Sequence, residues 1–286
     1  MAALQTAAGV VLVAVGAVFA TYTARHWRQY RAVAATPTTD LSRVEEGPVE
    51  VKGTVTEASA TAEPTIRGGP DPVVEAWEVE EWNERGDGAR WKTLALGVDG
   101  GRFLLETDDG EIEVDVPTSS SGSFSLPEAL LSTGMTGVAL DDVAVEVARM
   151  PYAQVEPDER PPDRVRSFVH AHRDVDGQTD SITNLIDIGN AHGERKYHSQ
   201  TVEVGDEVYV LGRATESADA PHPPRAEHMT VRGGPEDGVP MIVSTLREDR
   251  IVSQGRTRTR VAGAGAALAL AAGIWLLWAP YLAGAL

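Results

Sequence analysis

Apolar residues are concentrated in two runs, residues 2–23 and 261–286, and every Asp, Glu, Lys and Arg of the chain lies between them. A transmembrane helix needs about 20 apolar residues to cross a bilayer, and each run is long enough. The first run begins without the Lys or Arg of a signal peptide, which favours an uncleaved anchor. We therefore predict transmembrane helices at residues 1–24 and 261–286.

Arginines border both runs on the sides that face the middle of the chain. Arg25, Arg28 and Arg31 follow the first run, and a basic juxtamembrane segment, residues 251–260, precedes the second. Because cytoplasmic flanks carry the excess of basic side chains, we expect the middle of the chain in the cytoplasm and both termini outside. The predicted location is the cell membrane, with two spans in the bilayer.

Between the runs, alternation of apolar and polar residues predicts a β-rich soluble domain at residues 47–250. The first alternating stretch, residues 49–51, follows a polar juxtamembrane linker, residues 25–46. Residues 73–82 and 241–245 show further strand patterns. The sequence therefore predicts a mainly β (α+β) fold, barrel-like or sandwich-like, flanked by two transmembrane helices.

One hairpin is predicted at residues 102–116. In its second arm the apolar residues fall on one face and the acidic residues on the other, as in a half-buried strand. Asp109 and Gly110 are expected to supply the positive φ angles of its turn. The serine-rich residues 117–125 are predicted to be a loop, and residues 163–173 a helix that follows two prolines.

Two distant segments share one pattern. Residues 49–57 and 208–216 both read Val-x-Val-x-Gly-x-small-Thr-Glu, and each precedes a Thr-Ile/Val-Arg-Gly-Gly-Pro segment, at residues 65–70 and 230–235. Two matched landmarks in the same order predict duplicated strand units. We expect the glycine of each copy to lie at a bulge or a corner of its strand.

Acidic residues outnumber basic ones, 43 to 25, and the formal net charge is −18. This charge disfavours a nucleic acid as partner. The acidic composition is typical of proteins from salt-loving archaea, in which acidity keeps the surface hydrated. Because the sequence holds no cysteine, disulfides, thiolate zinc sites and cysteine nucleophiles are excluded.

No motif in the sequence predicts a catalytic, cofactor-binding or metal-binding site. The one candidate set of metal ligands combines histidines with nearby acidic residues: His170, His172, His192 and His198, with Asp141, Asp142 or Asp174. Two histidines at positions i and i+2 of a helix point to different faces, so exposed histidines in a polar stretch are the favoured interpretation. An enzyme at the membrane surface with a His/Asp site stays an alternative.

Small residues recur in both apolar runs, among them Gly9 and Gly16 in the first and Gly263, Gly265 and Gly273 in the second. Small residues let helices approach closely. We therefore expect the two helices to pack on each other or on another copy of the chain, which would give a homo-oligomer.

Residues 47–55, the hairpin at 102–116, and residues 195–197 and 205–214 carry a resemblance to a known family. The chain resembles the membrane domain of the GIDE or mulan-type ubiquitin ligases, which also lies between two transmembrane helices. The resemblance implies that this domain and the ligase module lie on opposite sides of the membrane. The arginines, in contrast, favour the cytoplasm for the domain.

In that family a RING after the second span recruits the ubiquitin-charged enzyme. A RING needs cysteines that this sequence does not contain, so the ligase activity does not carry over. We predict a membrane-anchored, non-catalytic interaction or scaffold module with an unknown protein partner. The alternative is a component of an E3 ubiquitin-ligase-like modification system whose catalytic module is a separate protein.

Overall fold

The computed structural model describes residues 2–62, 65–67, 72–83, 90–122, 137–140, 143–146, 152–157, 159–175, 192–217, 225–233, 241–246 and 248–283. The fold is mostly β, with two sheets between long terminal helices, as the sequence predicts. The terminal helices form one compact unit, and residues 36–124 with 135–248 form the other.

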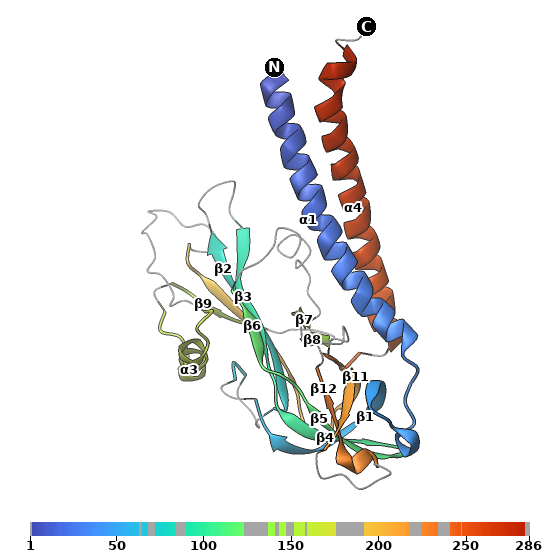
Figure 1. Cartoon of the computed structure of the whole chain (residues 1–286). Helices are drawn as coiled ribbons and strands as arrows, with labels where there is room; N and C mark the ends of the chain where they lie inside the picture. Colours follow the sequence, from blue (N-terminus) through green and yellow to red (C-terminus); the bar gives the residue numbers. More distant parts are fainter. Residues whose placement is uncertain are drawn as a thin grey trace. The chain divides into compact units, whose positions relative to one another are not determined.

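Two long helices, α1 (Ala2–Ala35) and α4 (Glu248–Ala283), contain the two apolar runs. They lie antiparallel, with both termini at the same end of the pair (Figure 1). Only 11% and 17% of their apolar windows, residues 4–24 and 259–279, are buried, so they are not core helices of a soluble protein. Both are long and apolar enough to cross a membrane.

Glycines bring α1 and α4 together. A Cβ atom on Gly9 would lie 2.9 Å from the Cγ atom of Leu277, and one on Gly16 would lie 2.7 Å from the Cγ atom of Leu270. The close helix approach predicted from small residues is therefore confirmed within the chain. Gly265 faces open space, and self-association of the chain stays a prediction.

Eight strands form the larger sheet, sheet A. In sheet order they are β1 (Gly47–Ala60), β4 (Arg102–Thr107), β5 (Gly110–Asp115), β12 (Met229–Arg232), β11 (Glu207–Glu216), β13 (Met241–Ser244), β8 (Val143–Glu146) and β7 (Gly137–Ala139). Strand β1 also pairs with β11, which closes the first five of these strands into a ring. Within the ring, β5 and β12 are parallel and the other neighbours antiparallel. Small five-stranded Greek-key barrels of this kind include the OB-fold.

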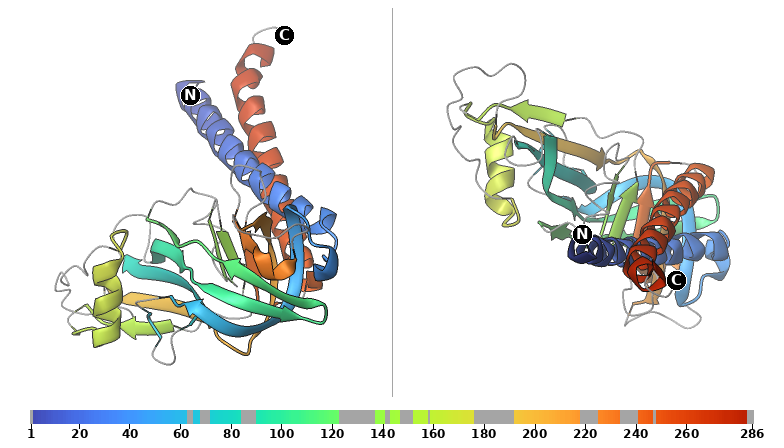
Figure 2. Two further views of the ribbon diagram at one scale, coloured as in Figure 1. Left: turned by 60° about the horizontal axis from the view of Figure 1, so that its bottom comes forward. Right: turned by 90° about the horizontal axis from the view of Figure 1, so that it is seen from above.

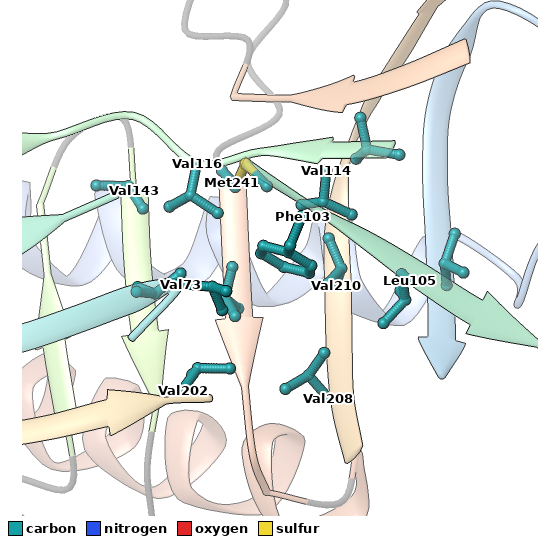
Figure 3. Close-up of a cluster of buried hydrophobic side chains, with 14 of the residues drawn as sticks. Val73, Phe103, Leu105, Val114, Val116, Val143, Val202, Val208, Val210 and Met241 are labelled. Carbon is teal, nitrogen blue, oxygen red and sulfur yellow. The ribbon is translucent and has the colours of Figure 1, made fainter. Parts of the chain in front are cut away.

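The interior of the ring is filled by apolar side chains from alternate positions of its strands. Phe103 and Leu105 come from β4, Val114 from β5 and Val210 from β11, and all four are fully buried. They belong to one cluster, in which Phe103 lies close to Val210 (Figure 3). The period-two alternation that predicted these strands is thus the pattern of side chains that point into the ring.

The two similar segments of the sequence pair with each other. Residues 47–54 of β1 lie antiparallel to residues 207–214 of β11. The second landmark takes different structures in the two copies: Thr230 to Arg232 is strand β12, whereas residues 65–67 form a bend. The copies diverge because their apolar residues are buried in different places. Val231 is buried in the ring, whereas Ile66 is buried in a second apolar core, which also contains Trp77 and Phe168.

The glycines of these segments lie where the ring changes partner strands. Gly53 stands where β1 passes from β11 to β4, and a Cβ atom there would lie 2.1 Å from the carbonyl oxygen of Glu106. Gly212 is also closely packed, since a Cβ atom added there would lie 2.7 Å from a methyl carbon of Val231. The irregularities in β1 come after Gly53, between Val55 and Ala60. Gly53 thus marks the change of partner, and the bulges follow it.

The hairpin of β4 and β5 is confirmed, but its turn differs from the prediction. Thr107 pairs with Gly110, so the turn residues are Asp108 and Asp109. Gly110 has a φ of +142°, and no described residue other than glycine has a positive φ, so Asp109 does not. The turn occupies residues 107–110, and of its two expected positive φ angles only that of Gly110 is present.

Five strands form the second sheet, sheet B: β6 (Ser119–Ser121), β3 (Arg90–Asp99), β2 (Val74–Asn83), β10 (Arg195–Val202) and β9 (Tyr152–Val155). They are inserted between ring strands, β2 and β3 before β4 and the others between β5 and β11. Strand β6 lies in the stretch predicted to be a loop, because its backbone pairs with residues 96–98 of β3. Helix α3 (Asp163–Ala171), predicted from the sequence, packs on one face of sheet B (Figure 2).

The segment predicted to be a linker is largely ordered structure. Helix α1 extends to Ala35, and the 3-10 helix η1 (Leu41–Arg43) follows, with Leu41 buried in the ring core. The carboxylate of Glu50 is only 1% exposed. It accepts hydrogen bonds from the hydroxyl groups of Thr38, at 2.9 Å, and Tyr209, at 3.0 Å. This buried carboxylate therefore fixes the start of the domain to the β1–β11 seam.

The close approach at Gly53 gives a test of the ring. We expect Gly53→Ala to destabilise the full chain by about 1–3 kcal/mol, because a rigid backbone carbonyl occupies the space of the new methyl group. Thermal unfolding in detergent micelles, followed by tryptophan fluorescence, measures the effect. Thr54→Ala, at the exposed neighbouring position, is the control and should change stability by about 0.5 kcal/mol or less. Equal stability of the two variants would contradict the described change of partner strands.

Candidate functional site

Sheet B carries a cluster of polar side chains on each face, and alternation decides which residues share a face. On β2, Glu75 and Trp77 point towards α3, together with the cross-strand neighbours Asp99 of β3 and Ser199 of β10. His172, which follows Ala171 and caps the C-terminus of α3, completes this group. We call these five residues the α3 cluster.

His172 joins α3 to sheet B. Its Nε2 atom lies 3.0 Å from both carboxylate oxygens of Asp99, and its Nδ1 atom lies 2.8 Å from the carbonyl oxygen of Phe168. The imidazole stacks on the Phe168 ring at a centroid distance of 4.1 Å and meets the edge of Trp77 at 4.8 Å. Burial opposes the charged form, but the Asp99 carboxylate prevails and raises the pKa of His172 above its ordinary value.

Glu75 is the most deeply buried acid of the cluster, with 0% exposure. Its Oε1 atom accepts hydrogen bonds from the hydroxyl group of Ser199 and, at 3.1 Å, from the backbone N–H of Ile66. Its Oε2 atom and the Nε1 atom of Trp77 have no hydrogen-bond partner among the described residues. Burial disfavours the carboxylate and raises the pKa of Glu75 to about 7.

The opposite face of sheet B carries a more accessible group. Glu80 lies 2.9 Å from the Nε2 atom of His198, and the side chains of both are partly exposed. Beside them, burial raises the pKa of Glu78 to about 7, although Thr93 donates a hydrogen bond to its carboxylate. Further along this face the ammonium of Lys196 lies 4.0 Å from the ring centre of Trp91, which Trp82 also contacts. This face offers carboxylates and aromatic rings, both of which attract cations.

The structure separates the histidines that the sequence grouped as possible metal ligands. His172 and His198 lie on opposite faces of sheet B, and His170 is exposed on α3, so the predicted divergence of His170 and His172 is confirmed. His192 lies on the segment before β10, Asp174 accepts a hydrogen bond from Ser120, and Asp141 and Asp142 lie outside the described residues. Among the residues that are described, no group of His, Asp or Glu could hold a metal ion.

Two of these histidines are not solvent-exposed residues of a polar stretch, which was the favoured interpretation. His172 and His198 each contact a carboxylate from a neighbouring strand, and their side chains are 10% and 17% exposed. His172 pairs with Asp99, an aspartate outside the set that the sequence suggested, and both side chains are largely buried. Ser199 donates its hydrogen bond to the carboxylate of Glu75 and not to an imidazole base.

Sequence reasoning missed Glu75 and Asp99, although the pattern held a signal for Glu75. Within β2, Glu75 has the same parity as Trp77 and Val79, so a carboxylate occupies the apolar face of a predicted strand. A lone acid on such a face is unusual. Its neighbour Asp99 could not be identified in this way, because only the pairing of β2 with β3 brings the two together.

Comparisons of this chain with protein families, curated proteins and solved structures found no match.

The raised pKa of Glu75 predicts how stability depends on pH. A carboxyl whose pKa rises on folding stabilises the fold fully below its ordinary pKa of 4.5, and this contribution is lost as pH rises to about 7. We expect Glu75→Gln, which cannot ionise, to exceed the native chain in stability above pH 7 by on the order of 2–3 kcal/mol.

Unfolding midpoints in detergent micelles from low to high pH measure this difference, which should vanish towards the ordinary pKa of the carboxyl. Glu111→Gln, at an exposed position of β5, is the matched control and should follow the native profile. A constant difference between Glu75→Gln and the native chain at every pH would refute the buried-carboxyl explanation.

Proposed function

We propose that the chain is a membrane-anchored, non-catalytic interaction module, whose β-rich domain binds a protein partner at the bilayer surface. The apolar surface of the helix pair carries this proposal. Leu268, Trp275 and Trp278 are 72%, 64% and 63% exposed, and Val10 and Val11 of α1 are also exposed. A surface of this kind is stable only where lipid replaces water.

The proposed orientation has the domain in the cytoplasm and both termini outside. The antiparallel pair places its two ends on one side, and arginines border both apolar runs at the opposite end. Basic flanks favour the cytoplasmic side of a membrane. Trp275 and Trp278 lie towards the far end of α4, where an outer belt of aromatic residues is expected.

A protein is the proposed partner because the ring surface does not suit a nucleic acid. The outward positions of β4 and β5 include Glu106, Glu111 and Glu113. Two arginines next to these acids, Arg102 and Arg232, already pair with Asp115, at 3.0 Å and 3.2 Å. In OB-fold barrels that bind oligonucleotides, this is the region that meets the ligand, and phosphates require basic side chains there.

The resemblance to the GIDE or mulan-type ligases is part of this proposal. Three of the segments that carry it, residues 47–55, 102–116 and 205–214, lie in strands β1, β4, β5 and β11 of one ring. A shared domain would require such a common structural unit. On this reading the sequence supplies the membrane domain, and a ubiquitin-like modification would need its catalytic module from a separate protein.

Side-specific labelling of single cysteines tests the anchoring and its orientation. The chain has no cysteine, so Asp108→Cys, in the exposed hairpin turn, and Leu286→Cys each give one reactive site. With an impermeant maleimide on intact cells, we expect labelling of Leu286→Cys and protection of Asp108→Cys until the membrane is permeabilised.

The reverse pattern would place the domain outside and favour the orientation that the GIDE resemblance implies. Extraction of the native chain from membranes by alkaline carbonate would contradict the anchoring itself. Val114→Cys, at a fully buried position of β5, is the control for accessibility and should stay unlabelled on both sides.

A further inference from the structure

The two hydrogen-bonding contacts of the His172 ring require a hydrogen at Nδ1 and a titratable proton between Nε2 and Asp99. The carbonyl oxygen of Phe168, 2.8 Å from Nδ1, can only accept a hydrogen bond, so Nδ1 carries a hydrogen. An ionised Asp99 can also only accept, and both of its oxygens lie 3.0 Å from Nε2. The Nε2–Asp99 contact therefore holds a proton, and the imidazole is positively charged when Asp99 is ionised.

This proton lies at the end of α3 that faces sheet B. His172 is the residue that caps the helix, and its backbone N–H is bonded to Phe168. Val165 and Phe168 place the apolar side of α3 on the sheet, while Arg166 pairs with Asp163 on the outer side. Of the side chains on α3, His172 alone is described as bonded to a side chain of sheet B.

The carboxylates of Asp99 on β3 and Glu75 on β2 face His172, and both favour its charged form. On β10 the same face carries the uncharged Ser199 and Thr201, the titratable Tyr197, whose pKa burial raises above its ordinary value, and Arg195, which pairs with Glu81 at 2.9 Å. On the helix side, His170 and Arg173 are exposed and Asp174 is bonded to Ser120. Loss of the proton would leave the buried Asp99 without its cation, and an unpaired buried charge is strongly destabilising.

We infer that α3 is a proton-operated latch: a proton held between His172 and Asp99 keeps the end of α3 on sheet B, and its loss releases that end. The released state uncovers Trp77, Val79 and Tyr197, which α3 covers when it is docked. The raised pKa of His172 supports a latch that keeps its proton to higher pH than an ordinary histidine does and that opens as pH rises. This device is independent of the proposed membrane role.

The test uses cysteines on α3 in the otherwise cysteine-free full chain, in detergent micelles. Val169→Cys lies on the partly buried side of the helix and Ser167→Cys on its exposed side. The ratio of their alkylation rates by iodoacetamide cancels the effect of pH on thiol reactivity. We expect this ratio to rise with pH, by at most about tenfold per unit, from the ordinary pKa of histidine to the raised pKa of docked His172, and to level off above it.

In a His172→Gln background, which cannot take up the proton, the ratio should lack the part of the rise that lies above the pKa of Glu75, about 7. His170→Gln, two residues earlier and exposed, is the matched control and should behave as the native chain. A ratio that does not change with pH in the native background overturns the latch, and so does an unchanged rise in His172→Gln.

Nitrogen NMR of the unaltered chain, with isotope-labelled nitrogen in its histidine rings, provides a second measurement. It does not depend on whether a substituted chain folds. His172 should show two protonated ring nitrogens at neutral pH, or one whose proton is shared with Asp99. A free neutral imidazole at that pH would overturn the latch.

Discussion

The antiparallel pairing of β1 with β11 is the contact on which the rest of the domain depends, because it joins segments about 160 residues apart and closes the ring. Without this pairing, β4, β5 and β12 would be an open sheet with the apolar side chains of the ring exposed. The same seam fixes the start of the domain, since Tyr209 of β11 donates a hydrogen bond to Glu50 of β1. One register thus determines both the closed core and the attachment of the segment that follows α1.

Sheet B follows from this ring, because its strands are insertions between ring strands. An insertion must bury its own faces, and sheet B does so in two ways. Val74, Ala76 and Val98 extend the ring core on one face, while α3 covers the second core on the other. The buried acids Glu75 and Glu78 occur in this inserted sheet, where burial raises the pKa of both to about 7. The sheet therefore gains pH dependence that the ring core, filled by aliphatic and aromatic side chains, does not have.

Much of the local structure could be predicted from the sequence, because local patterns depend on near neighbours. Ile112 and Val114 alternate with acids, and β5 forms where they predict it. Val165 and Phe168 lie three residues apart, and both face the sheet from α3. The two long apolar helices followed in the same way from the length and composition of the apolar runs.

What could not be predicted is pairing between distant segments. Ser119 to Ser121 form a strand only because β3 offers its edge, and nothing in the serines themselves indicates this. Asp99 becomes the partner of His172 only through the packing of α3 on sheet B. The α3 cluster thus depends on three long-range contacts: the pairing of β2 with β3, the pairing of β2 with β10, and the packing of α3 on sheet B. The sequence reveals only the unusual position of Glu75.

The acidity of the chain has two physical parts that respond to different conditions. Exposed acids such as Glu106 and Glu111 face each other across β4 and β5, and their repulsion is screened by salt. Glu75 and Asp99 are also cross-strand neighbours, but they are buried, and salt screens buried charges much less. Salt therefore acts mainly on the surface, whereas protons act on the α3 cluster. A strongly acidic chain can thus keep a pH-dependent core, because the two sets of carboxylates lie in different surroundings.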